Sequence, residues 1–160
     1  MNQHIEMMRL AEAEAKKSVC KRAQVGAVHW ADDGHVSYCY NFNADRDNFG
    51  GCCEGEDGKT LSSVLHAEAV AIGLSDAGYH SGGTLYVTRQ PCINCASLIV
   101  SAGIEQVFYR DADDKTDGLE LLAEHGVLLD SGWIAGQREP LIEPTLMQKI
   151  QASWLARWSV

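Results

Sequence analysis

The chain lacks the features of a membrane or secreted protein. It has no run of about 18 apolar residues, and residues 1–4 do not begin a signal peptide. Basic residues are also few, because 13 Lys and Arg stand against 22 Asp and Glu and the net charge is −9. A broad nucleic-acid surface needs a basic stripe, whereas a single mononucleotide needs only one or two local cations. We therefore expect a cytoplasmic protein that acts on a small molecule, with no membrane partner and no broad nucleic-acid surface.

Repeats, low-complexity segments and a convincing linker are absent too, so the 160 residues predict a single domain. Helices are expected over residues 5–18, from 66 to about 78, from 91 onward and over 118–125; strands are expected over 25–30, 36–40, 84–88, 105–109 and 127–129. A turn at residues 32–34 (DDG) joins the first two strands. The alternation of strands and helices predicts an α/β fold, a three-layer α/β/α sandwich around a mixed sheet of about five strands.

Six cysteines in a chain without a leader favour metal ligation or reduced thiols over disulfides. Cys92 and Cys95 follow an apolar strand and Pro91, whose fixed φ suits the first turn of a helix. Their i, i+3 spacing puts both sulfurs on one face, where the positive end of the helix dipole stabilises thiolates. Such a pair is half of a zinc site or a thioredoxin-like redox pair, and Cys-x-x-Cys alone does not distinguish the two.

The distinction depends on His66 and Glu68, which open another apolar helix. One imidazole and two thiolates give zinc three protein ligands and leave the fourth position for water, the pattern of a catalytic site. A purely structural zinc needs a fourth Cys or His, and none is evident in this cluster. Because His66 and Glu68 are two residues apart, they can share a site only where the helix begins. The sequence therefore predicts catalytic zinc on His66, Cys92 and Cys95, with Glu68 as general acid and base.

The stretches 66–68 (HAE) and 91–95 (PCINC) together resemble the signature of zinc-dependent nucleobase deaminases. Further stretches occur in the same order as in deoxycytidylate (dCMP) deaminases: 25–28 (VGAV), 40–41 (YN), 85–88 (LYVT) and 102–104 (AGI). The resemblance covers about residues 5–130 of this chain. It implies a cytidine deaminase-like fold and hydrolysis of dCMP to dUMP and ammonia. In that chemistry Glu68 carries protons from an activated water to the ring nitrogen and then to the leaving amino group.

The resemblance also implies which residues bind the substrate. Backbone groups at Ala67 and at Gln90-Pro91 face it, and Asn41 lies against the nucleoside, although Asn also favours turns for local reasons. Tyr109, at the end of a strand, is expected either to line the base pocket or to be a structural aromatic. One position departs from the family, which commonly has a glycine where this chain has Phe42; Phe does not adopt a positive φ cheaply. This departure bears on the loop geometry and, through it, on the exact nucleotide specificity.

Two further sets of residues are candidate ligand sites. Arg46, Arg89 and Arg110 are candidate phosphate partners, because the Arg fork matches phosphate geometry. Cys20, Cys52 and Cys53 are a candidate second zinc site, since some phage-like dCMP deaminases have a cysteine before Val-Gly-Ala-Val and a Cys-Cys pair in the next loop. No histidine in residues 43–63 supplies a last ligand, so Glu54, Glu56 or one of the paired cysteines would have to serve. The alternative is that all three cysteines are free thiols.

The C-terminal segment is expected to form an amphipathic helix over about residues 144–158, with Leu146, Ile150, Trp154 and Trp158 on one stripe. Such a stripe must pack on its own domain or on a neighbour, and related deaminases are oligomers, so we expect a homo-oligomer. Two alternatives to dCMP deamination remain open. One is deamination of another base compound, such as a free cytosine compound, guanine or a tRNA adenosine. The other is a non-catalytic zinc or redox protein.

Overall fold

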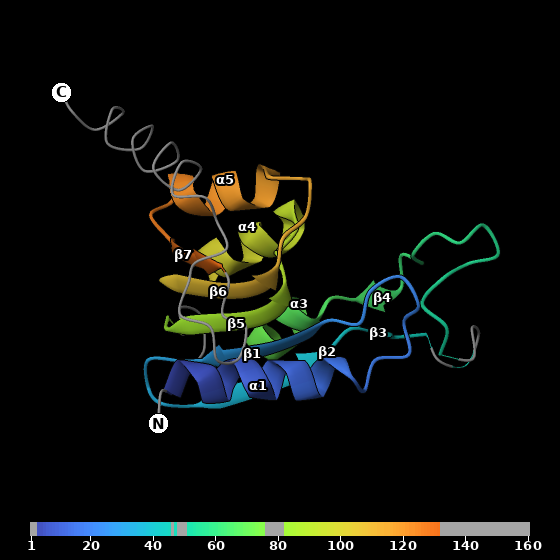
Figure 1. Cartoon of the computed structure of the whole chain (residues 1–160), viewed down its shortest axis with the longest axis horizontal. Coiled ribbons are helices and arrows are strands. Elements are labelled where there is room, and N and C mark those ends of the chain that lie inside the picture. Colours follow the sequence, from blue (N-terminus) through green and yellow to red (C-terminus); the bar gives the residue numbers. More distant parts are fainter. Residues whose placement is uncertain (1–2, 46, 48–50, 76–81, 132–160) are drawn as a thin grey trace.

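The computed structural model describes residues 3–45, 47, 51–75 and 82–131, and its centre is a mixed five-stranded sheet (Figure 1). The strands lie in the order β2-β1-β5-β6-β7, with bounds β2 Val36–Tyr40, β1 Gly26–Trp30, β5 Thr84–Arg89, β6 Gln106–Asp111 and β7 Leu128–Ser131. β1 is antiparallel to both neighbours, whereas β5, β6 and β7 are parallel. This is the mixed sheet that the sequence predicts, and the predicted strands are all present.

Helices cover both faces of the sheet (Figure 1). Helix α1 (Gln3–Ala15) lies over β1, β2 and β5, and α3 (Ala67–Gly73), α4 (Ile93–Ser101) and α5 (Asp117–Glu124) lie on the other side. The predicted three-layer α/β/α architecture is confirmed. None of the described helices has the length and apolarity that crossing a bilayer would require. The predicted helix at 144–158 and its apolar stripe lie outside the described residues.

Alternation along the strands produces two separate cores. Because successive side chains of a strand point to opposite faces, neighbours such as Tyr86 and Val87 enter different clusters. Tyr86 stacks on Phe108 in the cluster under α1, with ring centroids 5.1 Å apart. Val87 joins the larger cluster on the other face, which includes residues of α3, α4 and α5. Burial on both faces explains why β5 reads as an apolar run.

The start of β1 lies directly against α1. A Cβ atom added to Gly26 would be 1.9 Å from the carbonyl oxygen of Ala11 and 2.5 Å from the backbone nitrogen of Ala15. Only a residue without a side chain permits this approach of strand and helix. Helix α1 ends at Ala15, beside Gly26, and does not continue to residue 18 as the pattern predicts.

A lateral arm, which we define as residues 42–65, extends from the sheet (Figure 1). The sequence predicts irregular structure over most of it, but β3 (Phe42–Asn43) pairs antiparallel with β4 (Val64–Leu65). Phe42 thus adopts an extended conformation, and the left-handed turn that a glycine would permit is replaced by strand pairing. One carboxylate oxygen of Glu54 accepts hydrogen bonds from the backbone N–H groups of Lys21 and Arg22, at 2.9 and 3.0 Å. The arm begins beside β2 and ends at the helix that carries His66.

Candidate active site

His66 stands where the arm meets α3. It is the N-cap residue of that helix, with extended backbone angles (φ −77°, ψ 143°), and its carbonyl accepts the first helical hydrogen bond from Val70. Glu68 lies in the first turn of the helix. This arrangement confirms that the two residues, which would diverge within a helix, share the helix start. Ala67, between them, is fully buried.

Cys92 and Cys95 stand at the start of α4, directly after the central strand β5. Cys92 is the N-cap residue and Cys95 lies in the first turn, so both thiols are at the amino end of the helix. Pro91 precedes the cap, which corrects the prediction that it is the first helical residue. The Nδ1 atom of His66 is 3.7 Å from the Sγ of Cys92 and 3.4 Å from the Sγ of Cys95. Among the described residues, these three form the one cluster of at least three metal-ligating side chains.

The spacing of these donor atoms fits zinc. Tetrahedral bonds of about 2.3 Å to sulfur and 2.0–2.1 Å to nitrogen place a nitrogen and a sulfur ligand about 3.6 Å apart. The two distances from the His66 nitrogen, 3.7 and 3.4 Å, bracket that value. Cys95 is buried and Cys92 half-buried, while His66 is exposed, so the cluster is accessible from the solvent on the His66 side. Three ligands and an open side are the donor set of a catalytic zinc site.

The charges of the cluster also favour the binding of a cation. Hydrogen bonds from Cys95 and His66 lower the pKa of Cys92 to about 3, so this sulfur carries a negative charge. The hydrogen bond with Cys92, together with burial, raises the pKa of the Cys95 thiol well above its usual range. Two adjacent thiolates repel each other, and a divalent ion between them removes the conflict. The second sulfur can therefore become a ligand when a cation offsets the first charge.

Glu68 is buried beside the cluster, with 4% of its surface exposed. Burial raises the pKa of its carboxyl group, because the charged form loses its hydration. A raised pKa makes the carboxylate a stronger base, which suits a group that must accept a proton and then return it in general acid–base catalysis. Its position therefore agrees with the role that the sequence predicts.

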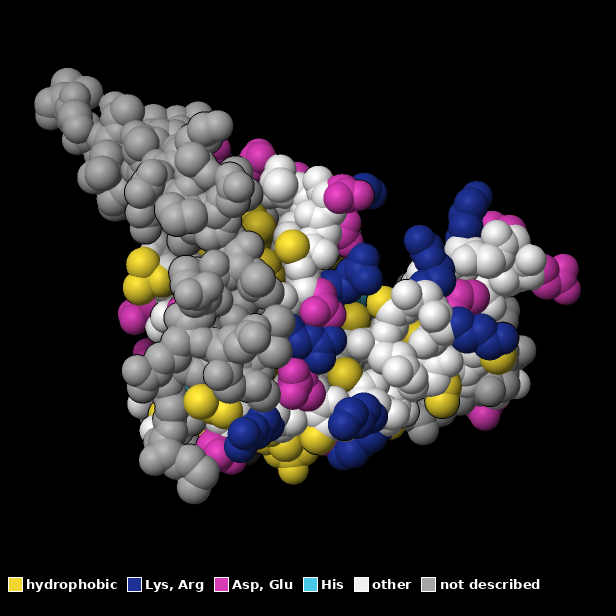
Figure 2. Space-filling view, viewed as in Figure 1, with side chains coloured by type: hydrophobic (Ala, Val, Ile, Leu, Met, Phe, Trp, Pro, Cys, Tyr) yellow, Lys and Arg dark blue, Asp and Glu magenta, His cyan; other side chains and the backbone are white. Residues whose placement is uncertain are grey.

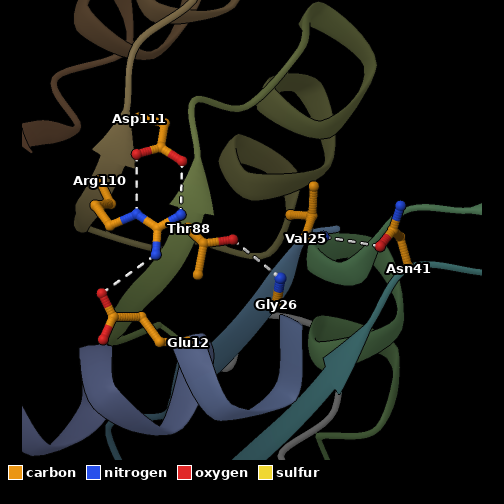
Figure 3. Close-up of polar contacts among 7 residues, drawn as sticks. All are labelled: Glu12, Val25, Gly26, Asn41, Thr88, Arg110 and Asp111. Carbon is orange, nitrogen blue, oxygen red and sulfur yellow. Dashed lines mark hydrogen bonds and ion pairs between the residues drawn. The ribbon is translucent and has the colours of Figure 1, made fainter. Parts of the chain in front are cut away.

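Asn41 makes two structural hydrogen bonds with its side chain. Its Oδ1 accepts from the backbone N–H of Val25 at 2.8 Å (Figure 3), and its Nδ2 donates to the carbonyl of Ala23 at 2.8 Å. The residue is 8% exposed, and both ends of its amide join the segment that leads into β1. The structure thus shows that the Asn41 side chain holds this segment in place, and its contact with a substrate stays a prediction.

Tyr109 and Gln90 are both buried. Tyr109, 1% exposed on β6, belongs to the large core cluster, which is the place of a structural aromatic rather than of a pocket lining. Gln90 follows β5 and is 7% exposed. Its side chain bonds to the segment after β6 rather than to the cluster of metal-ligating residues. The contact with the substrate that the resemblance implies would therefore come from the backbone of Gln90-Pro91.

The two described arginines of the candidate phosphate set are already paired with carboxylates. Arg110 binds both oxygens of Asp111 and one of Glu12 (Figure 3), and these partners raise its pKa above the usual range. Arg89 pairs with Asp113 at 2.6 Å. In this arrangement, carboxylates already occupy both guanidinium groups that were expected to bind phosphate. Arg46 lies outside the described residues.

The second cysteine set has a different arrangement from the predicted one. Cys20 and Cys53 are joined as a disulfide, with Cα atoms 5.0 Å apart, and Cys52 is an exposed free thiol. A zinc site needs thiolates, and a disulfide sulfur carries no such charge. The carboxylate of Glu54, a candidate last ligand, is used to bind two backbone N–H groups. The structure therefore shows a disulfide in place of the predicted second zinc, and it corrects the preference for reduced thiols at this pair.

Two further buried polar side chains, which the sequence did not mark as site residues, hydrogen-bond to the backbone. Asn43, 1% exposed, donates to the carbonyl of Cys52 at 2.6 Å and accepts from the N–H of Asp45 at 2.9 Å. The hydroxyl of Thr88 accepts from the N–H of Gly26 at 3.1 Å, which links β5 to β1 (Figure 3). An Asn that bonds the backbone two residues on is a recognised turn signal, so Asn43 was detectable in principle. Thr88 carries no such local signal.

Comparison with known proteins adds to this geometry. A family profile described as the cytidine and deoxycytidylate deaminase zinc-binding region matches residues 1–111. The deoxycytidylate deaminase of Mycobacterium phage D29 is 37% identical over 112 residues, which are 62% of this chain and 88% of that protein. A tRNA-specific adenosine deaminase of Streptococcus pyogenes serotype M1 is 27% identical over 109 residues, 59% of this chain and 63% of that protein.

A solved structure shares the fold. The crystal structure of dCMP deaminase from the cyanophage S-TIM5, in complex with dCMP and dUMP, matches with a TM-score of 0.71 and 33% sequence identity. The match covers 82% of this chain and 98% of that chain. The stretch matched by the family profile contains the whole metal-ligating cluster and Glu68.

Proposed function

The chain belongs to the cytidine and deoxycytidylate deaminase zinc-binding family, and from this premise we propose that it hydrolyses dCMP to dUMP and ammonia. The observation that carries the proposal is the cluster itself: one imidazole nitrogen and two sulfurs at zinc-ligand spacing, beside a buried carboxyl group. The choice of dCMP is supported by the phage relative, which is a deoxycytidylate deaminase, and by the cyanophage structure, which contains dCMP and dUMP.

His66, Cys92 and Cys95 would hold the zinc ion, which supplies a Lewis acid that lowers the pKa of water. Glu68 then moves the protons. Its carboxylate takes a proton from the attacking water and delivers it to the ring nitrogen N3, while the water oxygen bonds to C4. The second proton of the water passes through Glu68 to the amino group, and the C4–N bond breaks. The products are a uracil ring and ammonia, so one water is consumed for each amino group released.

The raised pKa of Glu68 suits this double role. A carboxyl group at its ordinary pKa is a weak base at neutral pH, whereas burial makes Glu68 a stronger one. The same burial keeps bulk water away from the proton once it is held. The backbone at Ala67 and at Gln90-Pro91, on either side of the cluster, would face the base.

A second candidate substrate, adenosine in tRNA, is raised by the Streptococcus relative. The charge distribution argues against it. The chain carries a net charge of −9, and on the face in Figure 2 Lys and Arg of the described residues are interspersed with Asp and Glu. Binding to a folded RNA depends on neutralising many phosphates, which such a surface does poorly.

Ammonia release tests the proposal. Purified protein with its zinc content measured would be incubated with dCMP, cytidine, cytosine, guanine and a tRNA substrate. Our proposal predicts release from dCMP well above all others, in one-to-one proportion with dUMP. Faster release from another base compound would contradict the dCMP assignment and leave the family assignment unaffected. Release from none of them, by zinc-loaded protein, would contradict both the reaction and the substrate.

A further inference from the structure

The segment after β6 wraps around the turn that carries Cys92. We use the name wrapping loop for residues 111–118, which run from the last residue of β6 to the first turn of α5. At its start, the carbonyl of Asp111 accepts a hydrogen bond from the N–H of Gln90 at 2.8 Å. At its end, Gly118 lies so close to the turn that an added Cβ would be 2.4 Å from the carbonyl oxygen of Pro91. The loop therefore touches the cysteine turn at both ends.

The middle of the wrapping loop is held by one side chain. The Oε1 atom of Gln90 accepts from the N–H of Asp113 at 3.0 Å, and its Nε2 donates to the carbonyl of Lys115. Among the described residues, Gln90 is the one residue outside the loop whose side chain bonds to the backbone of its middle part. Because Gln90 is 7% exposed, water competes little for these two bonds. The other link, from Arg89 to Asp113, joins two half-exposed side chains and is screened by solvent.

A cavity of about 150 Å³ lies between the wrapping loop and the turn. Its lining on the turn side is Pro91, Cys92 and Ile93, and on the loop side Asp113, Lys115 and Asp117. Gln90 lies at the junction of the two walls and also lines the cavity. The cavity thus borders a metal-ligating residue, and the position of its outer wall depends on the two bonds of the Gln90 amide.

We propose that Gln90 is a positioning residue that fixes the wrapping loop as one wall of the substrate site. Its side chain acts through the loop and makes no contact with the reacting atoms. The inference rests on the proposed function, since the wall matters only if a base compound is bound beside Cys92. Loss of the two bonds would leave the metal-ligating residues and Glu68 in place but let the wall move. The effect should therefore fall on substrate affinity rather than on the chemical step.

The test is the isosteric variant Gln90→Met, which removes both hydrogen bonds and keeps the volume of the side chain. We expect KM for the deaminated substrate to rise about tenfold, with kcat within about twofold of the wild type. Hydrogen exchange at the Asp113 amide should become faster, while the amides of β5 stay protected. In cobalt-substituted protein, the sulfur-to-metal absorption bands should stay unchanged. Gln24→Leu is the matched control, because its amide also donates to a backbone carbonyl, that of Ser18, outside the loop.

The outcomes separate this inference from the proposed function. A wild-type KM in folded Gln90→Met, or equal losses of kcat and metal, would overturn the positioning role. If Gln90→Met does not fold, Gln90→Glu decides in the same assays, because it keeps the acceptor for Asp113 and loses only the donor to Lys115. An unchanged KM there also overturns the inference. Absence of turnover in the zinc-loaded wild type contradicts the proposed function instead, and the Asp113 exchange rate still shows whether Gln90 holds the loop.

Discussion

The two halves of the metal-ligating cluster are supported in different ways. The cysteine half follows the central strand β5, which has β1 on one side and β6 on the other, and it is wrapped by residues 111–118. The histidine half follows β4, a two-residue strand that pairs with the two-residue strand β3. The sheet thus determines where the sulfurs lie, while the imidazole lies where the arm meets α3, a helix that itself packs on β1 and β2.

The arm has three described attachments to the segment after α1. They are the disulfide between Cys20 and Cys53, the Glu54 carboxylate on the N–H groups of Lys21 and Arg22, and a hydrogen bond from the Arg22 guanidinium to the Thr60 hydroxyl. The arm ends directly before His66. Substitutions in the arm should therefore change the position of His66 before that of the cysteines. Substitutions around α5 should instead change the position of Cys92 and Cys95.

The largest effect is expected from breaking the arm's covalent attachment. Cys53→Ser should lower the free energy of unfolding by roughly 2–4 kcal/mol, because a cross-link over 33 residues restricts the unfolded chain. Urea unfolding without reductant measures the change, and Cys39→Ser, at a free thiol, is the control. A dithiol should destabilise the wild type by a similar amount and leave Cys53→Ser unaffected. Equal stability of wild type and Cys53→Ser under oxidising conditions would contradict the disulfide.

The next largest effect is expected in the cysteine half. Gly118→Ala introduces a Cβ that must displace the backbone at Pro91 and Cys92, at a cost of about 1–3 kcal/mol and with weaker metal binding. Gly73→Ala is the matched control, since its added Cβ meets nothing within 4 Å. Thermal unfolding and zinc titration compare the two variants. Equal behaviour would show that α5 does not brace the turn.

Much of this contrast could be anticipated from the sequence. Pro91, which follows an apolar strand, predicts that Cys92 and Cys95 lie at a helix start. His66 and Glu68 are two residues apart and can share a site only where a helix begins. The strands were predictable because alternation and apolar runs survive in any tertiary context. The members of the cluster are therefore predictable from the sequence.

The remaining contacts could not be anticipated, since they join segments far apart in the chain. Strands of two residues, such as β3 and β4, have too little pattern to detect. The amide of Asn41 bonds the backbone 16 and 18 residues away, and no local signal separates this from a substrate contact. The same holds for Gln90, whose partners follow the next strand, and for the pairing of Cys20 with Cys53.

The smallest expected effect is electrostatic and concerns the wrapping loop. Arg89 holds the pKa of Asp113 below its usual range, so the ion pair stabilises the fold above the unfolded pKa of about 3.9. That stabilisation is lost as the pH falls through the lower, folded pKa. Asp113→Asn should therefore be slightly less stable than wild type at pH 7, and the difference should shrink towards zero at strongly acidic pH. The difference should be small, because both side chains are partly exposed and screened. A difference in melting temperature that stays constant with pH would assign the effect to something other than this pair.

The central claim is that the cluster holds zinc while Glu68, which is no ligand, moves the protons. Glu68→Gln tests it most directly. Zinc content and ammonia release from dCMP are measured on the same preparation, and Cys95→Ala, which removes a ligand, is the comparison. The account predicts one zinc per chain in Glu68→Gln with turnover lowered about a thousandfold, whereas Cys95→Ala loses the metal itself. Near-normal ammonia release by Glu68→Gln, or loss of its zinc, would contradict the account.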